Sequence, residues 1–366
     1  MTAVLLLACR GNNATGVQVE GDTVVFKYAT QIAVVRYEGY TVAQLKNPWK
    51  AGKTLHTYVL VPADRNLPEN LPEGTVLRTP LHQTAVFTAV HCALLGMLHQ
   101  EQALAGVADL RYVKLPWVHR RVAAGTTVDL GDAMSPVVER IIDGKPDAIL
   151  LSPFENSGGY GKLEDVNIPI VECAEYMETS PLGRAEWMRF YGMLFGCEQT
   201  ADSLFGVVDS TYHALKELAM TAKTTCSVIT DKVTGSVWYV PGGHSTIGQM
   251  MKDANANYVY AGDEHSGSVA LPFEAVLEQA GHADVWHFRY NASHDISYAE
   301  LLSEHHGYSQ FDAFKKHNVY GCDVSRSMFY EETPFRPDLL LTDFIQILHP
   351  DITNLPPARY YKKVNE

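Results

Sequence analysis

Two short apolar runs and a strongly marked helix start constrain the fold of this chain more than any other feature. The runs are Asp147-Ala148-Ile149-Leu150-Leu151-Ser152 and, some residues later, Ile168-Pro169-Ile170-Val171-Glu172. Short, continuous apolar runs of this kind are typical of strands buried in a parallel sheet. Ser180-Pro181 then provides a helix cap and a proline suited to the first helical turn. The order predicts an α/β domain from which a long helix leaves the sheet.

The length and composition favour a globular protein with two lobes. A chain of 366 residues exceeds what one hydrophobic core usually organises. The hydrophobic fraction of 46% and the charged fraction of 19% are close to the averages of globular domains. The net charge is −13 and no run of Lys and Arg could follow a phosphate backbone, so we expect no nucleic-acid partner. The six cysteines form no C-x-x-C pair, and we expect no structural metal site.

The first residues resemble the end of a bacterial lipoprotein signal. Met1 to Cys9 run through Leu5-Leu6-Leu7-Ala8 into a cysteine that would carry the lipid. A complete signal also has a charged leader and a longer apolar stretch, and neither is present here. We expect Cys9 to be lipidated and the residues that follow it to form a flexible tether. Elsewhere the chain has no run of the roughly 20 apolar residues that span a bilayer.

Periodicity divides the chain into five regions. Short alternating runs separated by turn residues predict an antiparallel β segment near the N-terminus, and two later regions repeat the order strand, helix, strand. Between them, apolar residues at helical spacing predict a long helical segment, which Gly192, Gly196 and Gly206 weaken and which we expect to break near Gly196-Cys197. The predicted regions are a signal remnant and tether (1–21), a β-rich extension (22–75), a first α/β lobe (76–178), an interdomain helix (179–222) and a second α/β lobe (223–366).

With these segments in this order, the chain resembles the class III periplasmic binding proteins that serve iron-siderophore, haem and cobalamin ABC importers. The likeness covers about residues 76–350, and the part at 22–62 is similar to lipoprotein members of Bacteroidetes-type bacteria. The matching segments are Pro146 to Leu150, Ser180 to Trp187, Gly242 to Thr246, Leu271 to Leu277 and Arg336 to Pro350.

The resemblance implies a fold and a function. The fold would be α/β, with two Rossmann-like lobes joined by a single long interdomain helix. The protein would be a monomer in the periplasm, held at the membrane only by its lipid, and it would carry a metal chelate as cargo without a cofactor of its own. Its partners would be this chelate and an inner-membrane ABC permease. One carboxylate per lobe would dock on the permease, and the matching positions are Glu274 and, less clearly, Glu155.

Ligand contacts are expected from loops at the carboxyl ends of the parallel strands, where such sheets bind their ligands. Aromatic side chains there offer flat surfaces, an arginine could pair with ligand carboxylates, and His91 or His244 could bind haem iron or cobalt axially. Each position alone is more often structural. The candidate cleft residues are His91, Phe154, Glu155 and Asn156 in the first lobe and Tyr239, His244, Ser245, Trp286, Arg289 and Tyr290 in the second.

Three other functions were weighed against this one. The segment that ends in Gly161-Lys162-Leu163 is not a phosphate loop, because Asn156 stands where glycine is needed and Leu163 where Ser or Thr is needed. The run Gly243-His244-Ser245 lacks the second glycine of a nucleophile elbow. We therefore expect no enzyme. A zinc or manganese binder would need three or four converging His, Asp or Glu side chains. A surface lipoprotein that captures its ligand without a permease remains the third alternative.

Overall fold

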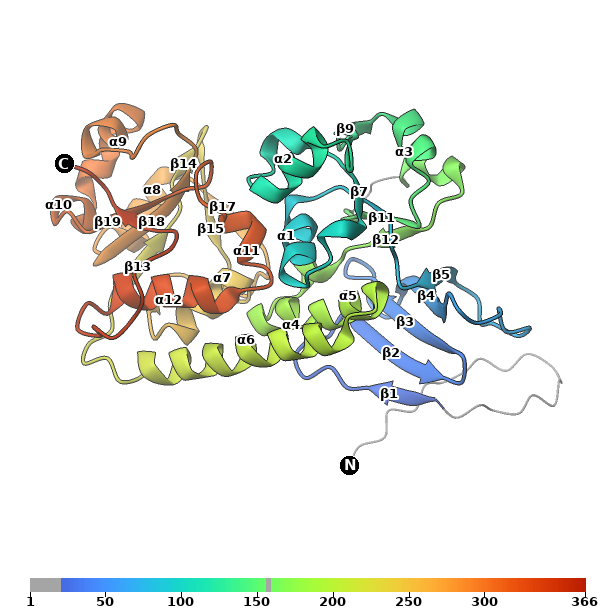
Figure 1. Ribbon diagram of the computed structural model, residues 1–366. Coiled ribbons are helices and arrows are strands. Elements are labelled where there is room, and N and C mark those ends of the chain that lie inside the picture. The colour runs from blue at the N-terminus through green and yellow to red at the C-terminus, as the bar shows by residue number, and fades with distance from the viewer. Residues whose placement is uncertain (1–20, 156–158) are drawn as a thin grey trace.

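The computed structural model describes residues 21–155 and 159–366. An N-terminal sheet adjoins the first of two α/β lobes, and one long helix runs beneath both lobes (Figure 1). The predicted α/β architecture with two lobes and a β-rich extension is confirmed.

The N-terminal extension is a five-stranded sheet in sequence order. Its first four strands are antiparallel, while the fifth lies parallel to the fourth. The sheet therefore continues past residue 75, because the run from Thr75 pairs with β4 and not with the first lobe. The strands are β1 (Asp22–Val24), β2 (Ile32–Tyr37), β3 (Tyr40–Lys46), β4 (Thr54–Pro62) and β5 (Thr75–Thr79).

The first lobe is built on a parallel sheet of order β12-β11-β6-β7-β8. Its two central strands, β6 (Thr84–Val86) and β11 (Ala148–Leu151), are buried on both faces, as the apolar run at 148–151 predicts. The other elements are α1 (Ala89–Met97), β7 (Leu104–Val107), α2 (Pro116–Ala123), β8 (Val128–Asp129), β9 (Gly131–Asp132), β10 (Ser135–Pro136), α3 (Val138–Gly144), a 3₁₀ helix (Gly161–Val166) and β12 (Ile170–Glu172).

The segment 179–222 forms three helices, because the chain divides near Gly196-Cys197, as predicted, and also at Trp187, where no break was predicted. They are α4 (Pro181–Glu186), α5 (Met188–Phe195) and α6 (Glu198–Ala219). Gly196 ends α5 with φ of +66°, a left-handed conformation that glycine adopts without strain. The long connection between the lobes is therefore α6 alone, whose buried residues recur at helical spacing (Figure 1).

The second lobe repeats the parallel arrangement with the order β16-β13-β18-β19-β20, in which β20 is antiparallel. The segment at 237–241 belongs to a separate antiparallel sheet of three strands, β14 (Val233–Thr234), β15 (Val237–Pro241) and β17 (Ser268–Leu271). The remaining elements are β13 (Ser227–Thr230), α7 (Thr246–Asp253), β16 (Asn257–Tyr258), α8 (Phe273–Ala280), β18 (Val285–Tyr290), α9 (Tyr298–Glu304), α10 (Asp312–Lys315), β19 (Val319–Asp323), α11 (Phe329–Glu332), α12 (Pro337–Leu348) and β20 (Lys362–Lys363).

Two buried carboxylates fasten the extension to the interdomain helices. Glu186 accepts hydrogen bonds from the backbone N–H groups of Lys27, Tyr28 and Ala29 at 2.7 to 2.9 Å. Glu178 accepts hydrogen bonds from the next two backbone N–H groups, from the Thr30 hydroxyl and from the indole of Trp187. Hydrogen bonds to ionised acceptors are roughly twice as strong as neutral ones, so this junction holds the extension firmly.

The two lobes also touch directly, at a contact between α1 and α11. Glu331 of α11 is fully buried and pairs with Lys114 of the first lobe at 2.8 Å. The Phe335 ring packs edge-on against the Tyr191 ring of α5 and the His91 ring of α1. The lobes are therefore joined by a buried ion pair and an aromatic cluster in addition to α6.

Candidate functional site

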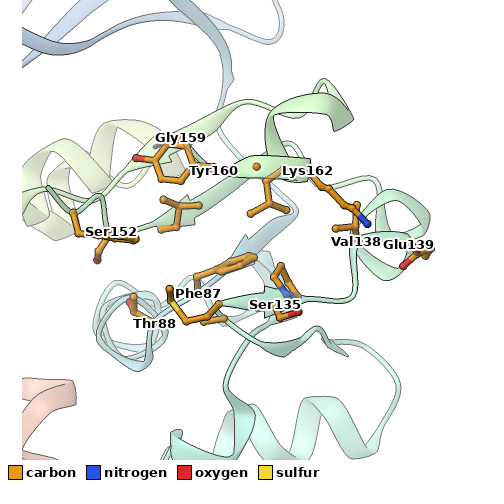
Figure 2. A pocket seen from close by; sticks show the side chains of 16 residues that line it. Phe87, Thr88, Ser135, Val138, Glu139, Ser152, Gly159, Tyr160 and Lys162 are labelled. Carbon is orange, nitrogen blue, oxygen red and sulfur yellow. The ribbon is translucent and has the colours of Figure 1, made fainter. Parts of the chain in front are cut away.

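A pocket of about 570 Å³ opens at the carboxyl end of the first-lobe sheet. Phe87 and Thr88 directly follow β6, and Ser152 follows the neighbouring strand β11. Parallel strands place their carboxyl ends at one edge of the sheet, which is where ligands of α/β proteins collect. Figure 2 shows Phe87 and Tyr160 on opposite sides of this space. The pocket is lined by Phe87, Thr88, Ala133, Met134, Ser135, Pro136, Val138, Glu139, Leu151, Ser152, Phe154, Gly159, Tyr160, Gly161, Lys162 and Leu163.

The lining combines flat apolar surface with a few polar groups. Three aromatic rings face the space, and the Phe154 side chain is 49% exposed at its edge. Thr88, Ser135 and Ser152 supply hydroxyls, while Lys162 supplies a cation. Pockets for small molecules are typically 300 to 1,000 Å³ and mostly apolar, with a small number of placed polar groups. The size and chemistry suit an organic ligand with planar parts.

Tyr160 is held in the pocket wall from behind. Its hydroxyl donates a hydrogen bond to Glu172 Oε1 at 2.5 Å, and its backbone N–H donates to Glu164. Burial, followed by the hydrogen bond to the Glu172 carboxylate, raises the pKa of the Tyr160 phenol far above its ordinary value. The group therefore stays protonated and its O–H remains committed to Glu172. The tyrosine presents its ring to the pocket.

His91, a predicted axial ligand, lies in the protein core. Its ring is 1% exposed, with Nε2 at 2.9 Å from the Tyr191 hydroxyl and 3.2 Å from Glu175 Oε1. Burial opposes a charge on the ring, but Cys173 and Glu175 together raise the pKa of His91 to about 10. Burial likewise opposes the Glu175 charge, yet His91 lowers the pKa of that carboxyl to about 2. The two side chains form a buried ion pair, and Nδ1 contacts the Thr88 hydroxyl, so both ring nitrogens already have partners.

Three second-lobe candidates also have structural partners. Trp286 is fully buried, and its indole donates to the Asp231 carbonyl. Arg289 directs Nε and Nη2 to Asp231 Oδ1 at 3.1 and 3.0 Å, so its charge is already paired. Ser245 caps α7 by accepting from the Gly248 N–H. Trp286 and Ser245 are buried, whereas the Arg289 side chain is about one third exposed, because strand ends predict the edge of a sheet but not how deep a side chain lies.

The other predicted residues are distributed over both lobes. Tyr239 and His244 are exposed on the second lobe, and neither lines the first-lobe pocket. The Tyr290 hydroxyl accepts a weak hydrogen bond from the Ile296 N–H. Glu274 lies in the first turn of α8 and Glu155 follows β11, and both carboxylates are exposed. Asn156 and Cys9 lie outside the described residues.

The structure adds pocket residues that the sequence analysis did not select. Ser135 lies in β10, Val138 and Glu139 lie at the start of α3, and Tyr160 and Lys162 lie at the start of the 3₁₀ helix that follows β11. The sequence pattern of that segment was compared only with a phosphate loop, which it does not match. An aromatic residue between glycines, just beyond a buried strand, was the signal that could have identified it.

Neither a membrane helix nor a metal centre is found in the part of the chain that the structure describes. None of its helices is both long and apolar enough to cross a bilayer. In residues 21–155 and 159–366, no three His, Cys, Asp or Glu side chains are grouped so that they could hold a metal ion. The zinc or manganese alternative therefore has no ligand set within these residues.

Comparisons with known proteins relate the chain to binding proteins. A lipoprotein of Methanocaldococcus jannaschii is 24% identical over 367 residues, which cover 94% of this chain and 86% of the relative. Because this match covers 94% of the chain, it extends into the N-terminal sheet. This relative therefore matches at least part of the N-terminal extension as well as the lobes.

Solved structures with the same fold cover less of this chain. A periplasmic haem-binding protein from Pseudomonas aeruginosa superimposes with a TM-score of 0.61 at 12% identity, over 78% of this chain and 99% of its own. A protein of an ABC-type Fe³⁺-hydroxamate transport system from Saccharomonospora viridis gives a TM-score of 0.57 at 17% identity, over 73% and 93%.

The family itself follows from a match over most of the chain. The periplasmic binding protein family matches residues 88–325, which include most of both lobes and all of the connecting helices. Members of this family bind substrates and are not enzymes, which confirms the expectation that this chain is no enzyme. Together with the two parallel-sheet lobes and the long α6, this match shows that the chain belongs to the periplasmic binding protein family.

Proposed function

We propose that this protein captures an iron chelate, either a ferric siderophore or haem, and delivers it to an ABC permease. The observation that carries the proposal is the pocket of about 570 Å³ at the strand ends of a periplasmic binding protein. Its aromatic rings would stack on planar parts of the chelate, while its hydroxyls and Lys162 would bind peripheral oxygens. Cobalamin is a further candidate cargo that rests on the sequence resemblance alone.

Relatives with the same fold support this class of cargo. One solved structure is a haem-binding protein, and another belongs to an Fe³⁺-hydroxamate transport system. Sequence identities of 12% and 17% show only that the fold is shared. The choice between these cargoes therefore depends on the chemistry of the pocket. The cargo would be held between the lobes, with the first-lobe pocket as the main contact.

Delivery would use the exposed carboxylates Glu274 and Glu155 as contacts with basic residues of the permease. Exposed ion pairs contribute little affinity, so these contacts would mainly orient the docked protein. Replacing both residues by glutamine should abolish uptake in cells while cargo binding in solution stays unchanged. Uptake that survives the double replacement would favour a surface lipoprotein that works without a permease.

The protein would work in the periplasm as a lipid-anchored monomer. Two relatives from Methanocaldococcus jannaschii are lipoproteins, which supports lipidation of Cys9. The affiliation with lipoproteins of Bacteroidetes-type bacteria remains a proposal, since these relatives come from an archaeon. Mass spectrometry of the protein extracted from its native membrane would detect the lipid on Cys9, and an unmodified cysteine would contradict the anchor.

A thermal-shift panel tests the cargo. The tag-free protein is melted with haem, cobalamin, several ferric siderophores, Zn²⁺ and Mn²⁺. A ligand at a hundred times its dissociation constant adds about 2.7 kcal/mol of stability. We expect a shift with one iron chelate, reduced in Phe154→Ala and preserved in Tyr112→Ala, a matched exposed aromatic outside the pocket. Shifts with bare metal ions alone would contradict the proposal.

A further inference from the structure

A buried carboxylate links the N-terminal extension to the wall of the pocket. Glu172, at the end of β12, is 8% exposed. Its Oε1 accepts the Tyr160 hydroxyl, while Oε2 lies 3.3 Å from Nδ1 of His56 in β4. Oε2 has no hydrogen-bond partner among the described residues. Within that part of the chain, His56 is the basic side chain at ion-pair distance from this oxygen.

The position of His56 is fixed by the extension. Its Nε2 lies 2.8 Å from the Thr75 hydroxyl of β5, and its ring stacks on Tyr58 at 4.4 Å between centroids. The Tyr58 hydroxyl accepts a hydrogen bond from the Glu172 N–H and donates one to the Ile170 carbonyl. Two side chains of β4 therefore contact Glu172. Tyr58 binds its backbone N–H, and His56 lies beside its carboxylate.

The direction of the Tyr160 side chain depends on its contact with Glu172. Gly159 has φ of +95°, and a Cβ there would lie 2.5 Å from Glu164 Oε1. Beyond the backbone contact to Glu164, the hydrogen bond to Glu172 fixes the direction of the phenol. Removing the His56 ring would leave open space beside Glu172 Oε2, which has no hydrogen bond among the described residues, so the carboxylate could move together with the Tyr160 hydroxyl bound to it. A change at His56 should therefore move the Tyr160 ring.

We propose that His56 of the N-terminal extension is a positioning residue for the ligand pocket, acting through Glu172 on Tyr160. His56 does not itself line the pocket but sets the orientation of one of its three aromatic rings. It lies outside residues 88–325, so the extension contributes to a pocket whose lining residues, apart from Phe87, all belong to the matched family region. The consequence for cargo affinity rests on the proposed function, whereas the effect on Tyr160 does not.

The positioning role can be measured without any cargo. The protein is labelled with 3-fluorotyrosine, and the ¹⁹F signal of Tyr160 is identified by its loss in Tyr160→Phe. We expect His56→Ala to shift and broaden this signal, Glu172→Gln to produce a similar change, and His56→Gln, which keeps an N–H donor, to restore much of the original position. His282→Ala, a fully solvated histidine paired with Asp312 in the second lobe, should leave the signal unmoved.

An unmoved Tyr160 signal in folded His56→Ala protein would overturn the proposal. For affinity, haem is titrated into the same variants, and we expect His56→Ala to bind about 2- to 12-fold more weakly, the cost of ordering one freed side chain. Haem affinity equal to that of the wild type would also count against the proposal. If the wild type binds no chelate, the proposed function fails, while the ¹⁹F result still decides the role of His56.

Discussion

Replacing His91 by alanine tests whether this histidine supports the core or binds the cargo. In the structure its ring pairs with Glu175 at 3.2 Å inside the first lobe, and both side chains are about 1% exposed. Removing the ring leaves a buried carboxylate without its closest cation. Breaking a buried ion pair in this way costs about 3 to 5 kcal/mol. We expect His91→Ala to lower the free energy of unfolding by this amount at neutral pH.

The assay is urea denaturation followed by tryptophan fluorescence, since Trp187 is fully buried in the same hydrophobic core. His282→Ala, which removes an exposed histidine, serves as the matched control and should unfold at the urea concentration of the wild type. Haem titrations of the folded variant should match those of the wild type. A loss below about 1 kcal/mol, combined with a lost haem spectrum, would refute the core assignment.

Three further predictions concern buried charges. Burial opposes the charge of Glu175, yet His91 lowers the pKa of this carboxyl from 4.5 to about 2. The contribution of Glu175 to stability is therefore complete above pH 4.5 and is lost as the pH falls toward 2. Melting temperatures should decline in that window, and the decline should be smaller in Glu175→Gln. Lys114→Met should lower the free energy of unfolding by about 3 to 5 kcal/mol and speed hydrogen exchange in α11, because it leaves the Glu331 carboxylate buried and unpaired. Unchanged exchange in α11 would contradict the ion pair between the lobes. Glu186→Gln should expose residues 26–31 to proteolysis, whereas Glu198→Gln, at an exposed pair with Arg36, should not.

Strong local signals predicted most of the architecture. The apolar run at 148–151 forms the buried strand β11, and Ser180 caps α4 with Pro181 in its first turn, because both signals are clear and local. The predicted boundary after residue 75 falls inside β5, which pairs with β4, because a short strand has the same pattern whichever partner it pairs with. The predicted break near Gly196-Cys197 is present, whereas no glycine or proline marks the further division at Trp187.

The candidate site was harder to predict because it depends on contacts between distant residues. The sequence indicated the loop after β11, and Phe154 does line the pocket. His91 and Trp286 follow the same rule for strand ends, yet both side chains turn into the core, where Glu175 and Asp231 provide partners. The support of Tyr160 by Glu172 and His56 joins three elements that no local pattern relates.

The most direct test of the account is to locate the iron in crystals of the protein grown with the chelate that gives the largest thermal shift. Anomalous diffraction at the iron absorption edge places the metal without any assumption about the ligand. We predict a single strong peak beside the first-lobe pocket, with the chelate in contact with Phe87 and Tyr160. A peak on the second lobe near Tyr239, or bound directly to protein side chains without a chelate, would contradict the central claim.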